Sequence, residues 1–324
     1  MQLQFLEYLQ KRDFEAYSLL SEKLITFNNG SKYGQIVFLA GGAGSGKGFA
    51  VNNYISGNDF KVRDVDELKI AFQKLDAMGK FTTDDLLKKY SDKIKESDAA
   101  FIEKNITSKG LSLSQLNLKV PEHVYALHVL IRATGVKEKT LELLLDGAKE
   151  NILPNILFDS TFADMSDLET YLPKLIEIGY NPKNIHIAWV LTNYEIAMKN
   201  NASRARVVPD DILLRTHKGA AQTILSLVKK SLPITIDGGI YVILNNPENT
   251  MFLIDPKTGE HYKDIKGRKV VKDFLYITMK KPGKSITTDT DVKKQLYTWI
   301  KDNVPPGSLD TKELDDLWWS LNIL

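Results

Sequence analysis

The sequence predicts an α/β protein: a parallel sheet flanked by helices, with a helical insertion and a C-terminal α+β extension. Short apolar runs typical of buried strands alternate with longer segments of helical periodicity. A glycine-rich loop directly follows the first strong apolar run, Ile36 to Ala40. Two later predicted strands, a short charged one and an apolar one, end in acidic residues at Asp64 and Asp159 respectively. Ligands of open α/β sheets bind beyond such strand ends, so a site is expected there.

The glycine loop is the strongest functional signal in the chain. It fits the first seven positions of the phosphate-binding pattern G-x-x-x-x-G-K-[ST]. Glycines let backbone N–H groups converge on an anion, and a helix N-terminus and Lys47 add positive charge. An ordinary glycine-rich turn is the alternative, but the strand before the loop, the spacing and the lysine favour a nucleoside triphosphate site. The residues expected to bind ATP are Gly41, Gly42, Ala43, Gly44, Ser45, Gly46, Lys47, Gly48 and Phe49.

One position departs from the pattern. Gly48 stands where Ser or Thr usually binds Mg²⁺, and Phe49 follows it. The loop is similar to that of adenylate kinases, which also have Gly after the lysine but then place a Thr. Either Mg²⁺ is held by phosphates, waters and carboxylates, or the site binds nucleotide with weakened catalysis.

Composition narrows the class of protein. The chain has 324 residues, a net charge of +2 and no cysteine. Disulfides, thiol catalysis and cysteine-based zinc sites are therefore excluded, and overall charge implies no polyelectrolyte partner. We find neither a secretory apolar core after Met1 nor a stretch long enough to span a bilayer, so we expect a cytoplasmic protein without a membrane partner.

The expected organisation has four parts. Helices occupy residues 1–33, and the core comprises residues 34–67 and 150–245. The segment 68–149 reads as a helical insertion over one side of the site, where it would take part in substrate choice. Residues 246–324 form a C-terminal basic extension.

Acidic residues at the end of the second strand are candidates for catalysis. Asp64 and Asp66 are spaced i, i+2, so on an extended chain they share a face. Asp64 is a candidate for metal coordination and substrate contact, and Asp66 for the general base. The alternative is a solvated acidic turn that caps the helix from Glu67.

A further strand ends in Asp159, followed by two hydroxyl residues. Asp159 is a candidate Mg²⁺ ligand, and Ser160 or Thr161 could bind an acceptor phosphate or sugar. The alternative is a helix N-cap for residues 165–178, and both can hold together.

Paired arginines follow the next strand and helix. Arg204 and Arg206 precede a helix that begins near Asp210 and carries Arg215 and His217. Guanidinium groups there could bind phosphate bidentately and offset charge on a transferring phosphoryl group, as in a kinase lid. A solvated basic helix end is the alternative.

The C-terminal third is predicted to contain strands at 234–237, 239–244 and 251–254, with a hairpin at 245–249. A helix is expected at 291–303. Basic residues with interleaved aromatics make nucleic-acid contact one interpretation of this region, and a plain solvated face the other. The basic residues are Lys257, Lys263, Lys266, Arg268, Lys269, Lys272, Lys280, Lys281 and Lys284.

Taken in order, these features resemble the zeta-toxin and polynucleotide-kinase branch of P-loop kinases. The resemblance covers roughly residues 34–66 and 150–225. It rests on the glycine loop, the D-x-D-E at Asp64, the D-x-T at Asp159 and the lid segment with Arg204 and Arg206. It implies an ATP- and Mg²⁺-dependent kinase of an alcohol acceptor: a nucleotide, nucleotide sugar or polynucleotide. In that case Lys47 binds the β- and γ-phosphates, Asp66 accepts the hydroxyl proton, and Arg204 and Arg206 stabilise the transferring group.

Two other classes remain open. One is a nucleotide-binding interaction protein with little phosphotransfer. The other is a motor-type NTPase, which is disfavoured because the acidic pair at Asp66 follows a short, charged strand.

Overall fold

The computed structural model describes residues 25, 27, 32–55, 60–146, 153–204, 207–229, 236–264 and 267–309, without the side chains of residues 64–66 and 229. Most of the expected N-terminal helices, at residues 1–24, 26 and 28–31, lie outside this part of the chain. So does Arg206.

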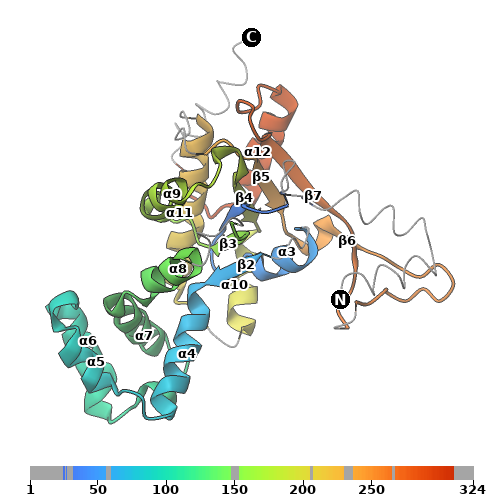
Figure 1. Cartoon of the computed structure of the whole chain (residues 1–324). Coiled ribbons are helices and arrows are strands. Elements are labelled where there is room, and N and C mark those ends of the chain that lie inside the picture. The colour runs from blue at the N-terminus through green and yellow to red at the C-terminus, as the bar shows by residue number, and fades with distance from the viewer. Residues whose placement is uncertain are drawn as a thin grey trace.

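One seven-stranded sheet organises the described chain, in the order β2-β3-β1-β4-β5-β7-β6 (Figure 1). The five strands from β2 to β5 are parallel, as predicted, whereas β7 is antiparallel to both β5 and β6. The sheet is therefore mixed. The strands are β1 Ile36–Ala40, β2 Lys61–Asp64, β3 Ile156–Asp159, β4 Ile185–Leu191, β5 Ile240–Leu244, β6 Thr250–Phe252 and β7 Val271–Lys280.

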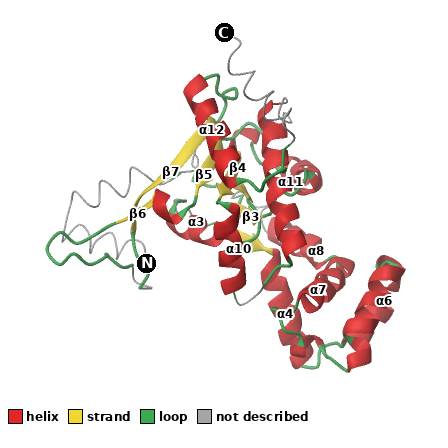
Figure 2. Ribbon diagram, turned by 180° about the vertical axis from the view of Figure 1, so that it is seen from behind, coloured by secondary structure: helices red, strands yellow, loops and turns green. Residues whose placement is uncertain are grey.

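Helices cover both faces of the sheet because the central strands are apolar on both sides. All five residues of β1 are buried. Ile36 and Phe38 pack with residues of α8 Val136–Asp146, α9 Ser166–Ile178, α11 Asp210–Lys229 and α12 Thr290–Asn303. Val37 and Leu39 pack with residues of α3 Lys47–Asn53 on the other face. Figure 2 shows α11 and α12 against the strands.

The segment between β2 and β3 is helical, as predicted. Its other helices are α4 Val65–Ala77, α5 Thr83–Lys89, α6 Glu96–Asn105 and α7 Pro121–Thr134. They share an apolar core of their own, and α5 and α6 lie away from the sheet in both views (Figures 1 and 2). Local sequence explains two of the starts: Thr82 and Asp85 form a capping box, and Pro121 occupies the first turn of α7.

The structure corrects the geometry expected at Asp64 and Asp66. Strand β2 ends at Asp64, and α4 begins at Val65, so Asp66 lies in the first helical turn. The two residues are therefore not on one face of an extended chain. The backbone becomes helical where the pairing with β3 stops, at the register pair of Asp64 and Asp159. The acidic ends of the two strands thus lie side by side.

The predicted hairpin at 245–249 is wrong. Strands β5 and β6 are not neighbours, because β7 lies between them and pairs with each. Strand β7 is not among the predicted strands, because its lysines and aromatic residues also fit a basic surface. The sequence predicts a strand at residues 234–237. Residues 236 and 237, the two of these that the structure describes, are not in a strand. The helix expected at 291–303 is present as α12.

The sheet continues across the domain boundary expected at residue 245, and the boundaries themselves stay a prediction.

A buried histidine links the centre of the sheet to the loop before β5. His186, on β4, is 1% exposed. Its Nδ1 accepts a hydrogen bond from the Gly239 amide at 2.8 Å, so Nε2 carries the proton and donates to Gln35 Oε1 at 3.0 Å. Burial, with a smaller contribution from Lys280, lowers the pKa of His186 to about 3. A second proton would displace the Gly239 contact.

This geometry predicts acid-sensitive stability. The unfolded chain protonates His186 near pH 6.5 and the folded chain near pH 3, so stability is complete above pH 6.5 and falls as the pH is lowered towards 3. The expected loss from this residue is about 1.4 kcal/mol per pH unit. Urea unfolding between pH 7.5 and 4.5 should show a shallower pH slope in His186→Gln than in the unmodified chain. Equal slopes would contradict the assignment.

Candidate functional site

The glycine loop spans the gap between the buried end of β1 and the start of α3. Its glycines are required by backbone contacts as well as by dihedral angles. Gly44 has φ +74°, and a Cβ there would lie 2.2 Å from the carbonyl oxygen of Ala197, in α10 Tyr194–Ser203. Gly46, at φ +83°, forms the N-cap of α3. The loop is therefore held against α10 with no room for a side chain at Gly44.

Side chains from distant elements hold the backbone of the loop. On α11, Thr216 accepts a hydrogen bond from the Ala43 amide at 3.3 Å, and His217 Nε2 lies 2.8 Å from the Ala43 carbonyl oxygen. Two further carbonyls are bound from other elements. Asn200 Nδ2 donates to Gly44 O at 3.0 Å. Ser45 O accepts from Thr192 Oγ1 at 2.7 Å and from Asn245 Nδ2 at 2.8 Å.

The carbonyl groups thus face the protein, while the first N–H groups of α3 have no intrahelical acceptor and can bind an anion. This arrangement is typical of a phosphate-binding loop. The N-terminal partial charge of α3 has the sign that attracts a phosphate.

His217 is neutral in this position. Burial is the main cause that lowers its pKa, to about 4, and the nearby Lys47 lowers it further. Because the Ala43 carbonyl can only accept, the single ring proton lies on Nε2.

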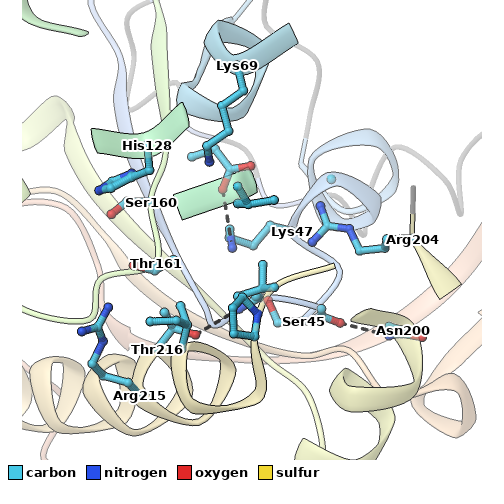
Figure 3. A pocket seen from close by; sticks show the side chains of 18 of the residues that line it. Ser45, Lys47, Lys69, His128, Ser160, Thr161, Asn200, Arg204, Arg215 and Thr216 are labelled. Carbon is cyan, nitrogen blue, oxygen red and sulfur yellow. Dashed lines mark hydrogen bonds and ion pairs between the residues drawn. The ribbon is translucent and has the colours of Figure 1, made fainter. Parts of the chain in front are cut away.

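Lys47 folds back over the loop. Its ammonium donates to Gly41 O at 2.7 Å and Gly42 O at 3.4 Å, and lies 3.7 Å from Asp159 Oδ1. Figure 3 shows Lys47 projecting into the pocket, with Ser160 and Thr161 on one side and Arg204 on the other. The predicted loop lysine and the predicted acidic strand end therefore meet, as expected from the ends of adjacent parallel strands.

A cavity of about 880 Å³ opens beside the loop. Its walls come from the ends of β2 and β3, from the helical segment 65–146, and from α10 and α11. Among the described side chains that line it, cations outnumber acids. The described cations are Lys47, Arg63, Lys69, Arg132, Lys137, Arg204 and Arg215, and the described acids are Asp159 and Asp167. These described charges favour a polyanion.

Several of these cations were not identified in the sequence. Arg63, Lys69, Arg132 and Lys137 look like ordinary surface residues of strands and helices when read along the chain. The one available signal was the position of Arg63, directly before the acidic end of a strand. The helical insertion brings the other three to the cavity, which fits its expected place over one side of the site.

Ser160 and Thr161 line the cavity, and their contact with an acceptor stays a prediction. The Ser160 hydroxyl donates to the Asp167 carboxylate and accepts from the Phe162 amide at 3.1 Å. The alternative role for this segment, as the N-cap of the next helix, is wrong. Helix α9 has Met165 at its N-cap with no side-chain bond.

The structure describes only some of the other predicted site residues. Arg204 forms the C-cap of α10 and lines the cavity. Its partner Arg206 lies outside the described residues, so the paired-arginine lid stays a prediction. The backbone of Asp66 follows the end of β2, beside β3, but the side chains of Asp64 and Asp66 are not described.

Hydroxyl and carboxylate groups for a metal are sparse. A Cβ at Gly48 would meet no atom within 4 Å, so the position that usually carries a hydroxyl is open space. The Ser45 hydroxyl is buried without a hydrogen-bond partner in the described structure. Within the described ranges no group of three or more His, Cys, Asp or Glu side chains could hold a metal ion. Asp159 is the predicted ligand that the structure places beside the loop.

The basic C-terminal residues have mixed surroundings. Lys280 is 5% exposed and pairs with Asp237 at 2.8 Å. Arg268 pairs with Asp264 at 2.6 Å. Part of this charge is therefore used within the fold, and nucleic-acid contact stays a prediction. None of the helices in the described ranges is both long and apolar enough to cross a membrane.

The contact at Gly44 predicts a sharp difference between two glycine substitutions. Gly44→Ala would force Cβ against the Ala197 carbonyl in a strained backbone conformation, and ATP binding should be lost. Gly48→Ala adds a Cβ in open space on a helix that favours alanine, so its loss of affinity should be far smaller. Fluorescent ATP-analogue titration, with melting curves to show that both variants fold, measures the difference. Similar affinities in the two variants would contradict this loop geometry.

Comparisons with known proteins find only remote structural similarity. No family model matches the sequence, and neither does any curated protein. A chain of the native AvrRxo1-ORF1:AvrRxo1-ORF2 complex shares 12% sequence identity at a TM-score of 0.35. The match covers 98% of this chain and 82% of the other chain. The same complex with ATP shares 13% sequence identity at a TM-score of 0.33. The match covers 95% of this chain and 79% of the other chain. A chain of the PezAT toxin-antitoxin system of Streptococcus pneumoniae shares 12% sequence identity at a TM-score of 0.29. The match covers 74% of this chain and 77% of the other chain. These TM-scores are too low to carry a functional assignment, which therefore rests on the site itself.

Proposed function

We propose that this protein is an ATP-dependent kinase that transfers the γ-phosphate to a hydroxyl of a small phosphorylated acceptor, such as a nucleotide or nucleotide sugar. The observation that carries the proposal is the meeting of Lys47 with Asp159 in a cavity that other cations also line. A glycine loop alone binds phosphate. A loop that opens into a second charged space can also hold an acceptor.

The proposed reaction is an in-line displacement at the γ-phosphorus. The acceptor hydroxyl oxygen attacks phosphorus while its proton passes to the carboxylate of Asp66. The bond from the γ-phosphorus to the bridging oxygen breaks, and ADP leaves with the electron pair. Lys47 and Arg204 supply positive charge to the phosphoryl oxygens. Catalysis of this kind depends on positioning and electrostatic stabilisation.

A divalent cation fits part of this site. Asp159 offers a hard oxygen ligand beside Lys47, and the unpartnered Ser45 hydroxyl offers a further oxygen within the loop. When bound, Mg²⁺ would neutralise charge on the β- and γ-phosphates. Asp64, whose backbone is in register with that of Asp159, is the second proposed ligand.

The cavity has the size of a small-molecule site. Its volume of about 880 Å³ lies within the range of about 300–1,000 Å³ that is usual for small-molecule sites. The helical segment 65–146 supplies one wall, and this wall carries cations that could recognise acceptor phosphates.

A second candidate is a nucleotide-binding interaction protein with little phosphotransfer. The open space at Gly48 favours it, because a missing hydroxyl weakens the binding of Mg²⁺ at the loop. Binding of ATP without turnover on any acceptor would support this alternative.

An acceptor screen tests the kinase. Purified protein, Mg²⁺ and γ-labelled ATP should label at least one nucleotide or nucleotide sugar. Lys47→Ala should lower the rate by about 10³-fold, because it removes charge stabilisation from the transferring group. Asp66→Asn should lower kcat while ATP affinity is retained, because the loss is confined to proton transfer. ATP binding with no transfer and no hydrolysis would overturn the proposal.

Restoring the hydroxyl beside the loop lysine gives an independent prediction. The free space around Gly48 allows Gly48→Ser without a clash. The new hydroxyl stands where this class of loop normally binds Mg²⁺, so the Mg²⁺ concentration for half-maximal transfer should fall. A Mg²⁺ titration of the initial rate measures this, with Gly48→Ala as the matched control for the added Cβ. A serine variant that behaves like the alanine variant would show that the metal is held elsewhere.

A further inference from the structure

Arg63 occupies an unusual position at the edge of the cavity. It lies on β2, one residue before the end of the strand, and its guanidinium carbon is 5.5 Å from the ring centroid of Phe158 and 5.0 Å from that of Tyr171. Its Nη2 atom is buried and has no hydrogen-bond partner in the described structure. Arg63 also lines the cavity.

An unpaired buried guanidinium nitrogen is costly. Arginine stays protonated in proteins, so Arg63 cannot avoid the cost by losing its charge. A buried donor without an acceptor loses its hydration and gains nothing in return. The two aromatic rings favour the guanidinium plane electrostatically but accept no strong hydrogen bond. Nη2 therefore lacks an acceptor in the described structure, while the Arg63 side chain lines the cavity.

Lys137 lies on the same aromatic ring as Arg63 and has an acidic partner. Lys137 lies 5.3 Å from the same Tyr171 ring and pairs with Asp167 at 2.9 Å. The other oxygen of Asp167 accepts the Ser160 hydroxyl. The Asp167 carboxylate thus binds one cation, Lys137, and one hydroxyl. The buried Lys69 also lines the cavity.

The sheet order places this cluster away from the glycine loop. The loop leaves β1, Asp159 ends the neighbouring β3, and Arg63 lies on β2, one strand further. A group bound at Arg63 would therefore approach Asp159 from the side opposite the loop. An acceptor held there would present its hydroxyl between the two sites.

We propose that Arg63, with Lys137 and Lys69, forms a second anion subsite that holds a phosphate group of the acceptor. This inference rests on the proposed kinase function and assigns its acceptor specificity to these residues. A planar guanidinium fork matches two phosphate oxygens, and the flanking rings restrict its orientation before the ligand arrives. The subsite would accept a phosphate monoester or diester and disfavour an uncharged alcohol.

Binding of pyrophosphate to protein already saturated with adenylyl imidodiphosphate tests the subsite without any turnover. The analogue occupies the glycine loop, so calorimetry should report a separate pyrophosphate site in the unmodified chain. Arg63→Gln should weaken this second site by about tenfold or more, the effect of losing a charge-assisted hydrogen bond. Arg63→Lys keeps the charge without the fork and should give an intermediate loss. Arg268→Gln, which removes one exposed arginine from the extension, is the matched control and should bind like the unmodified chain.

Absence of the second site in the unmodified chain, or equal affinity in Arg63→Gln, would overturn the inference. Crystals of the unmodified protein soaked in selenate give a second measurement that does not depend on the folding of a variant. An anomalous peak within hydrogen-bonding distance of Arg63 Nη2 is expected, and its absence would also overturn the inference.

The two proposals fail in different ways. Pyrophosphate bound at Arg63 without transfer to any acceptor would retain the subsite and remove the kinase. Transfer to a phosphorylated acceptor with an unchanged KM in Arg63→Gln would retain the kinase and remove the subsite.

Discussion

The structure depends above all on how the glycine loop is held against α10 and α11. A glycine loop has little conformational preference of its own, so its shape must come from its contacts. Gly44 is pressed against the Ala197 carbonyl, and Thr216 with His217 binds both polar groups of the Ala43 peptide. These contacts fix the loop before any ligand arrives. Preorganisation of this kind lowers the cost of binding a phosphate chain.

The C-terminal extension supports the same loop from the other side. Tyr54, at the end of α3, stacks on Phe274 of β7 at a centroid distance of 4.1 Å and donates to Asn245 Oδ1 at 2.9 Å. The amide of Asn245 in turn binds the Ser45 carbonyl. Phe49 meets the Tyr54 ring edge to face at 5.3 Å. Phe49, which follows Gly48 in the loop, therefore packs on this aromatic cluster. Strand β7 is thus part of the support of the loop.

Charge in the cavity is arranged in two groups. Lys47 is drawn towards Asp159 and two loop carbonyls, and these contacts must be exchanged for phosphate contacts when a nucleotide binds. Across β3, Arg63 and Lys137 flank the Tyr171 ring, with Asp167 as their acidic neighbour. Two cationic groups in one cavity suit the proposed reaction, in which both substrates carry phosphate. Such a site attracts its ligands electrostatically and orients them by directional hydrogen bonds.

The sequence by itself determined the local features of this protein. Apolar runs predicted β1, β3, β4 and β5, and spacing predicted the loop and the helical segment after β2, because these signals depend on neighbours along the chain. Tertiary structure decided the rest. Strand β7 entered the sheet between β5 and β6 through pairing that periodicity does not encode. Asp66 became helical where the pairing of β2 ended. Arg63 and Lys137 reached one cavity because the insertion folds back over the sheet edge, a contact between residues far apart in sequence.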